Sequence, residues 1–295
     1  AAAEDVTLPI KPGASAGTVL IPKAGFTGMG VVIVAGSGPT DRNGNQAALP
    51  NNSLKMLAEG LARRGIASAR FDKRFSGKTR LTGYGEKDIR FGHFVSDAVL
   101  WARHLAKQPG MKRIGFIGHS QGGLVATLAA TRLKSAHLVL LAAPGFNIAD
   151  TLKRQFTKAI PTEQARKPVF DAIGRLRRGE GVPDYRGPAA GFFRPSLQPF
   201  LISWMAHDPA MRLTAFAGKV LIVQGTRDLQ IGRDAAARLK AAKSTAALVT
   251  IKGMNHVLKA PGPGRAANVA AYSKPDLPLA PGLIDAVARF LNATR

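Results

Sequence analysis

The chain has 295 residues, of which 45% are hydrophobic and 6% aromatic, so it is long enough to bury a large core. It contains no cysteine, which excludes disulfide bonds, cysteine nucleophiles and thiolate metal sites. No apolar run reaches the length that a membrane-spanning helix needs, so a transmembrane protein is not expected.

Lysine and arginine number 42 against 18 aspartate and glutamate residues, which gives a formal net charge of +24. A field of this sign attracts polyanions without selecting among them. The basic residues are scattered, and no zinc-finger spacing, RNP-like aromatic block or basic zipper accompanies them. We therefore expect a solvated basic surface that is open to non-specific polyanion or anionic-surface contact, and no specific recognition of nucleic acid.

The first residues, Ala1 to Asp5, begin with three alanines and contain no methionine. Such a start is typical of what remains after a signal peptidase cuts beside small residues, and it is equally an arbitrary boundary of the chain. An exported protein, periplasmic or secreted, is one expectation. A cytoplasmic protein is the other.

Short β-branched runs alternate with amphipathic segments along the chain. The runs predict strands at residues 18–21, 30–35, 66–71, 113–117, 137–142, 220–224 and 247–251. Apolar residues spaced three and four apart predict helices at residues 54–64, 94–107, 124–133, 233–242 and 283–291. Because parallel strands need crossover connections, this alternation predicts an α/β fold with a mostly parallel sheet flanked by helices.

One long segment interrupts the alternation. It has helical patterns but no convincing strand, and the patterns fall at residues 151–160, 163–178 and 197–207. An insertion of this length between two core strands is expected to fold back over their carboxyl ends as a helical cap. We expect a core of residues 1–145 and 218–295 and a cap of residues 146–217. Residues 260–281 are expected to form a loop.

A G-x-S-x-G pentapeptide, Gly118 to Gly122, joins a predicted strand to a predicted helix. In a nucleophile elbow, glycines on either side of the serine allow the sharp turn that holds its hydroxyl out at the edge of the sheet. The pentapeptide alone is weak, because a chain with 32 glycines can contain one by chance. Its place between a strand and a helix makes Ser120 the candidate nucleophile.

A serine hydroxyl needs a base within hydrogen-bond reach and an acid that orients the base. Asp228 follows the predicted strand 220–224, and His256 follows the predicted strand 247–251. The carboxyl ends of parallel strands are where active sites lie in such sheets. The order Ser120, Asp228, His256 is that of the α/β-hydrolases.

Other residues compete for these roles. His119 adjoins the serine on a tight turn, so its side chain is expected to point elsewhere, which leaves His207 as the rival base. Structural or solvated roles are expected for His93, His104 and His137. Among the acids, Asp234 is expected to open the following helix, and Asp208, before a proline, is expected to be a turn residue.

An oxyanion hole must stabilise the charge that develops on the carbonyl oxygen. One donor is expected to be the backbone N–H of Gln121, at the start of a helix. The second is expected from the loop after strand 30–35. By position it is the N–H of Ser37, with Gly36 as the alternative. The other interpretation of this loop is a plain turn, whose shape a pair between Asp41 and Arg42 is predicted to hold.

These motifs resemble the α/β-hydrolase superfamily, and within it an esterase-like serine hydrolase group whose first loop reads G-S-G-P-x-D-R-x-G. That loop is Gly36 to Gly44 here. The similarity covers nearly the full chain and extends through Arg70 to Arg74, Gly118 to Gly122, Gly225 to Asp228, Gly253 to His256, Tyr272 and Pro278. One departure is Phe75, where the group usually has glycine, so the local loop shape is expected to differ.

The resemblance implies a serine carboxylic ester hydrolase with a helical cap and with no metal or organic cofactor. The hypothesis is that a small-molecule ester with a small or medium acyl group is cleaved through an acyl-enzyme on Ser120. The sequence identifies no substrate-binding residue. One alternative keeps the same three residues in a peptidase, amidase or thioesterase. The other is a non-enzymatic polyanion-binding protein in which the charge of +24 is the function.

Overall fold

A computed structural model describes residues 2–293 of the chain. One sheet runs through the molecule in the order β1-β2-β4-β3-β6-β7-β8-β9, and β5 pairs with β2. The strands are β1 Ala2–Ile10, β2 Gly13–Ile21, β3 Met29–Val34, β4 Ile66–Phe71, β5 Arg80–Leu81, β6 Arg113–His119, β7 His137–Leu141, β8 Lys219–Gly225 and β9 Ala247–Ile251. From β4 to β9 all neighbours are parallel, whereas β1, β2 and β5 pair in antiparallel fashion.

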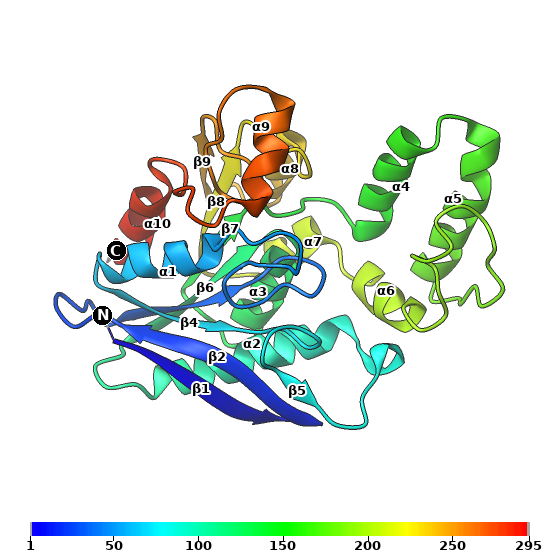
Figure 1. Cartoon of the computed structure of the whole chain (residues 1–295). Helices are drawn as coiled ribbons and strands as arrows, with labels where there is room; N and C mark the ends of the chain where they lie inside the picture. Colours follow the sequence, from blue (N-terminus) through cyan, green and yellow to red (C-terminus); the bar gives the residue numbers. More distant parts are fainter. Residues whose placement is uncertain (1, 294–295) are drawn as a thin grey trace.

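Helices cover both faces of the sheet (Figure 1). One face carries α2 Phe91–Ala106, α3 Gln121–Arg132 and α8 Arg233–Ala242, and the other carries α1 Ser53–Ala62 and α10 Leu283–Asn292. Alternate residues of the inner strands divide between the two sides: Val32 packs into the first core and Val31 into the second. Because side chains alternate along a strand, a continuous apolar run feeds both cores. The expected α/β-hydrolase architecture is confirmed.

Four helices lie between β7 and β8: α4 Ile148–Ala159, α5 Glu163–Arg177, α6 Gln198–Met205 and α7 Pro209–Thr214. Figure 1 shows α4, α5 and α6 grouped to one side of the sheet, while α7 packs against α3 and α8 of the core. The predicted helical patterns in this segment are confirmed. The division into a core and a cap at residues 146–217 stays a prediction.

Residues 260–281, expected to be a loop, contain the helix α9 Gly264–Ala270 and the 3-10 turn η2 Ala271–Ser273. The expectation was wrong because Gly262, Pro263 and Gly264 punctuate the chain only at the start of the helix, and alanines favour helix after them. Within residues 2–293, no helix combines the length and the apolar character that crossing a bilayer requires.

Candidate active site

Ser120 lies at the turn between β6 and α3 with φ 53° and ψ −127°, a backbone conformation rare for a residue with a side chain. Both flanking glycines are required by close backbone approach. A Cβ on Gly118 would lie 2.2 Å from the carbonyl oxygen of Gly122, and a Cβ on Gly122 would lie 2.3 Å from that of Val34. The pentapeptide therefore folds as the tight turn that its sequence predicts.

The imidazole of His256 is held by the carboxylate of Asp228, with Nδ1 2.9 Å from Oδ2 and 3.1 Å from Oδ1. Oδ1 also accepts hydrogen bonds from the backbone N–H groups of Gln230 and Ile231, at 2.8 and 2.9 Å. Burial by itself raises the pKa of Asp228, but the hydrogen bond from His256 and these two amides outweigh burial and hold that pKa below its usual value. An ionised acceptor fixes the proton on Nδ1, which leaves Nε2 as the free base.

Ser120 and His256 line one cavity of about 270 Å³. Within the described residues, neither Ser120 Oγ nor His256 Nε2 makes a hydrogen bond, to each other or elsewhere. The structure thus joins Asp228 directly to His256 and brings His256 and Ser120 to the same cavity. In unliganded sites such contacts are often long and tighten when substrate binds.

His119 also lines the cavity of Ser120, and its ring is tied to the loop that carries His256. Its Nε2 lies 2.7 Å from the backbone carbonyl oxygen of His256, and a carbonyl only accepts, so Nε2 carries the proton. Burial, with a smaller contribution from the neighbouring His256, lowers the pKa of His119 to about 4. His119 is therefore a neutral side chain that ties the turn at Ser120 to the loop of His256, a role that no sequence pattern predicts.

The rival residues lie elsewhere. His207 packs its ring on Phe91, 5.8 Å between centroids, and does not line the cavity of Ser120. Asp234 lies in the first turn of α8 and pairs with Arg154 at 2.7 Å. Asp208 caps α7, as its carboxylate accepts a hydrogen bond from the backbone N–H of Met211. None of the three contacts His256.

The two expected oxyanion donors are unoccupied: no described residue accepts a hydrogen bond from the backbone N–H of Ser37 or of Gln121. The carbonyl oxygen of Ser37 is held instead, by Thr40 Oγ1 at 2.8 Å and Gln46 Nε2 at 3.0 Å. These bonds fix the peptide planes of the loop, and the cavity of Ser120 is lined by Gly36 and Ser37.

Lys73 connects the two segments that carry these donors. Its Nζ donates hydrogen bonds to the carbonyl oxygen of Gly36 and, at 3.4 Å, to Oε1 of Gln121. The side chain is fully buried and its ammonium lies over the ring of Phe94, 5.1 Å from the centroid. Burial lowers the pKa of Lys73 to about 7. Sequence reasoning gave Lys73 no role, although it follows β4 within the segment Arg70 to Arg74 that carries the family resemblance.

Asp41 and Arg42 do not pair, so that prediction was wrong. Asp41 accepts hydrogen bonds from the backbone N–H groups of Asn43 and Asn45, at 2.8 and 2.9 Å. Arg42 reaches instead to the buried carboxylate of Asp72, at 2.8 Å from Nη2 and 3.2 Å from Nε. A bidentate pair in a buried setting is stronger than a contact across one exposed turn, so Arg42 is drawn inward.

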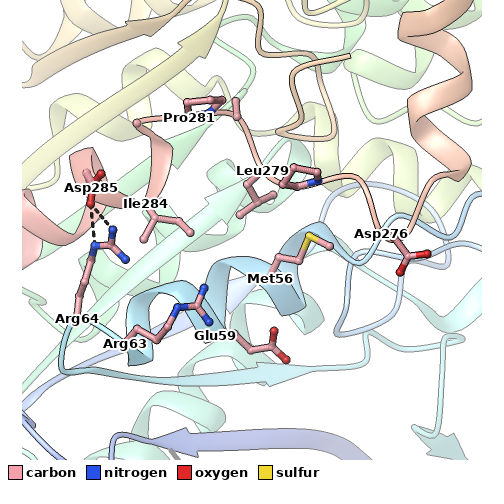
Figure 2. Close-up of a pocket in the computed structure, with 12 residues that line it drawn as sticks. Met56, Glu59, Arg63, Arg64, Asp276, Leu279, Pro281, Ile284 and Asp285 are labelled. Atoms are coloured by element: carbon pink, nitrogen blue, oxygen red, sulfur yellow. Dashed lines mark hydrogen bonds and ion pairs between the residues drawn. The ribbon is translucent and has the colours of Figure 1, made fainter. Parts of the chain in front are cut away.

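Figure 2 shows a different cavity, of about 320 Å³, between α1 and the segment that leads into α10. Arg64 points across it and pairs with Asp285, 2.8 Å from Nε to Oδ1. Its lining includes no serine or histidine, so it offers no counterpart to the Ser120 site. Among residues 2–293, no cluster of three or more histidine, aspartate or glutamate side chains is arranged to hold a metal ion.

Residues 31–271 match the alpha/beta hydrolase family, and the chain belongs to that family. Esterase EstD of Thermotoga maritima is 25% identical over an alignment of 284 residues. The alignment covers 93% of this chain and 65% of EstD, so the chain spans less than two thirds of that relative.

Solved structures share the fold. Est1E from Butyrivibrio proteoclasticus, solved with ferulic acid bound, superposes with a TM-score of 0.61 at 17% identity, over 97% of this chain and 96% of Est1E. A thioesterase domain from the curacin biosynthetic pathway superposes with a TM-score of 0.57 at 14% identity, over 99% of both chains. At these identities the similarity shows the fold, and one fold hosts many functions.

Proposed function

We propose that the protein is a serine hydrolase of carboxylic esters, with Ser120 as nucleophile, His256 as general base and acid, and Asp228 as the group that orients His256. The observation that carries the proposal is the arrangement at one cavity. A buried carboxylate fixes the tautomer of an imidazole, and that imidazole lines the same cavity as a serine held in a strained turn.

In the first step, the proton of Ser120 Oγ passes to His256 Nε2 as Oγ bonds to the ester carbonyl carbon. The negative charge on the carbonyl oxygen is met by the N–H groups of Gln121 and Ser37, with Gly36 as the alternative to Ser37. The bond to the alcohol oxygen then breaks, and that oxygen takes the proton from Nε2. In the second step, water loses its proton to Nε2, attacks the acyl carbon and releases Ser120 with its proton restored.

Esters are favoured over amides and thioesters by the relative EstD, which is named an esterase, and by the resemblance to the group with the G-S-G-P-x-D-R-x-G loop. We infer that the chain belongs to that group. We further propose that residues 146–217 act as a cap that sizes a small or medium acyl group. Ile148 and Leu152 of α4 and Leu201 of α6 line a cavity that borders Ser37, which supports that role.

A panel of matched substrates tests the proposal: an ester, a thioester and an aminoacyl amide of one acyl group, each assayed with the parent protein and with Ser120→Ala. We expect ester turnover to exceed amide and thioester turnover after correction for their uncatalysed rates, and to vanish in the variant. Amide turnover above ester turnover would reject the assignment. Steep salt-dependent binding of polyanions without any turnover would favour the non-enzymatic alternative.

A further inference from the structure

Two cavities of opposite chemical character meet at Ser37, beside the proposed nucleophile. The smaller, of about 270 Å³, contains Ser120 and His256, and hydrogen-bonding side chains line much of the rest of it: Thr40, Gln46, Asn51, Gln230 and Tyr272. The larger, of about 760 Å³, is lined mainly by aromatic and aliphatic side chains, among them Phe94, Leu152, Phe192, Phe200, Leu201 and Trp204.

The larger cavity offers no free charge to an ionised ligand. Three charged side chains line it, and each is already paired. Arg74 Nε lies 2.8 Å from Oδ2 of Asp97, and Arg194 Nε lies 2.8 Å from Oε2 of Glu86. Because a paired guanidinium has little left for a second carboxylate, this cavity suits an apolar group.

The chemistry decides which part of an ester enters each cavity. The alcohol oxygen must lie next to His256 to receive its proton, and His256 lines only the smaller, polar cavity. The carbonyl oxygen must lie at the N–H groups of Ser37 and Gln121, and Gln121 lines the larger, apolar cavity. The acyl chain attached to that carbonyl therefore extends into the apolar side.

We infer that the site divides its substrate by polarity: the apolar cavity takes an apolar, aryl-sized acyl group, and the polar cavity takes a hydroxylated alcohol. This inference rests on the proposed function and makes it more specific. It assigns the substrate class to esters that join an apolar acid to a polyol, and it disfavours the reverse combination.

Phe75 supports the assignment of the acyl side. Its backbone has φ 66°, in the left-handed region that favours glycine, and its side chain lines the apolar cavity and stacks on Tyr84 at 5.8 Å. A bulky residue in this conformation carries a local cost that glycine would avoid. The chain keeps an aromatic ring there, 44% exposed, at the wall of the acyl cavity. We assign Phe75 as a residue that determines acyl specificity.

Two isomeric esters test this assignment, because the apolar group is on the acyl side in glyceryl 3-phenylpropanoate and on the alcohol side in 3-phenylpropyl glycerate. The values of kcat/KM are compared after correction for the rate at which hydroxide hydrolyses each ester. We expect kcat/KM at least about tenfold higher for the glyceryl ester, a typical discrimination for one well-fitted apolar group. Equal or reversed values, with both esters turned over through Ser120, would overturn the inference and leave the proposed function standing. No turnover of either ester or of 4-nitrophenyl acetate would overturn both.

Two variants test the two cavities one at a time, Phe75→Gly in the apolar cavity and Tyr272→Phe in the polar cavity. Phe75→Gly is expected to lower the ratio of kcat/KM for glyceryl 3-phenylpropanoate to kcat/KM for glyceryl acetate by about fivefold or more, without lowering the melting temperature. Lys134→Gly is the matched control, since Lys134 has φ 52°, is exposed and does not line either cavity.

Tyr272→Phe removes one hydroxyl from the polar cavity. It is expected to lower kcat/KM for the glyceryl ester relative to the ethyl ester of the same acid by about two- to tenfold. A fall of equal size for glyceryl acetate in Phe75→Gly, or an equal fall for the ethyl ester in Tyr272→Phe, would contradict the assignment of the two cavities.

Discussion

Replacing Lys73 by methionine removes the buried ammonium that joins the loop of Ser37 to the helix of Gln121, and it keeps a side chain of similar length. The carbonyl of Gly36 then loses its charged donor. A buried acceptor left without a partner costs about 1–3 kcal/mol, and the loop can avoid that cost by rotating its peptide planes. If the same energy is lost from the oxyanion hole, kcat falls about 5- to 150-fold while KM changes little.

A stability measurement separates this role from general damage to the fold. The pKa of Lys73 is lowered by burial from its ordinary 10.5 to about 7, so between those values the unfolded chain binds more protons than the folded one. Stability of the parent protein should therefore gain from this group as pH rises from about 7 toward 10.

Lys73→Met lacks that gain. The assay is thermal unfolding of both proteins across this pH range, beside steady-state kinetics on one ester. A difference in melting temperature between the two proteins that stays constant across the pH range, or a variant with unchanged kcat, would refute the reasoning.

Three further outcomes follow from the structure. Gly122→Ala should destabilise the protein by on the order of 3 kcal/mol or more, because the added Cβ would lie 2.3 Å from the carbonyl oxygen of Val34. Gly92→Ala, which has open space around it, should instead stabilise α2 by about 0.5–1 kcal/mol. Thermal unfolding of the two variants compares these effects. Asp228→Asn should lower kcat by about 10³- to 10⁴-fold with the fold intact, since an amide no longer fixes the tautomer of His256, and near-parental kcat would contradict that role. As the pH falls from 6.5 to 4, His119→Gln should lose less stability than the parent protein. Folding lowers the pKa of His119 to about 4, so in this range the unfolded parent chain binds a proton that the folded chain does not. Equal acid unfolding curves of the two proteins would show that burial of His119 has no such effect.

The inner strands could be predicted from the sequence because they are buried on both faces. Strand β4, which is buried along its length, has the predicted bounds, and β8, which is buried except at its first residue, differs by one residue at each end. Strand β9 also has the predicted bounds, although it lies at the sheet edge and is largely exposed, because residues that favour strands fill it between turn residues. Strand β1 was missed because Glu4 and Asp5 give it the composition of a solvated segment, and it lies at the edge of the sheet, where polar side chains face water.

In the candidate site too, some residues could be predicted from the sequence and others could not. Ser120, Asp228 and His256 could be placed because each stands directly after a recognisable strand, and parallel strands end at one edge. Lys73 could not be assigned a role, because its partners Gly36 and Gln121 lie 37 and 48 positions away and only the fold brings them together. The backbone strain at Phe75 is a property of the folded loop that no residue pattern encodes.

The central claim is that Ser120 becomes a nucleophile through His256, and labelling with a fluorophosphonate tests it most directly. Intact mass spectrometry would follow the parent, Ser120→Ala and His256→Ala under identical exposure. We predict one adduct per chain on the parent, none on Ser120→Ala and a much slower reaction on His256→Ala. An adduct that persists on Ser120→Ala, or labelling of His256→Ala at the parental rate, would contradict the account.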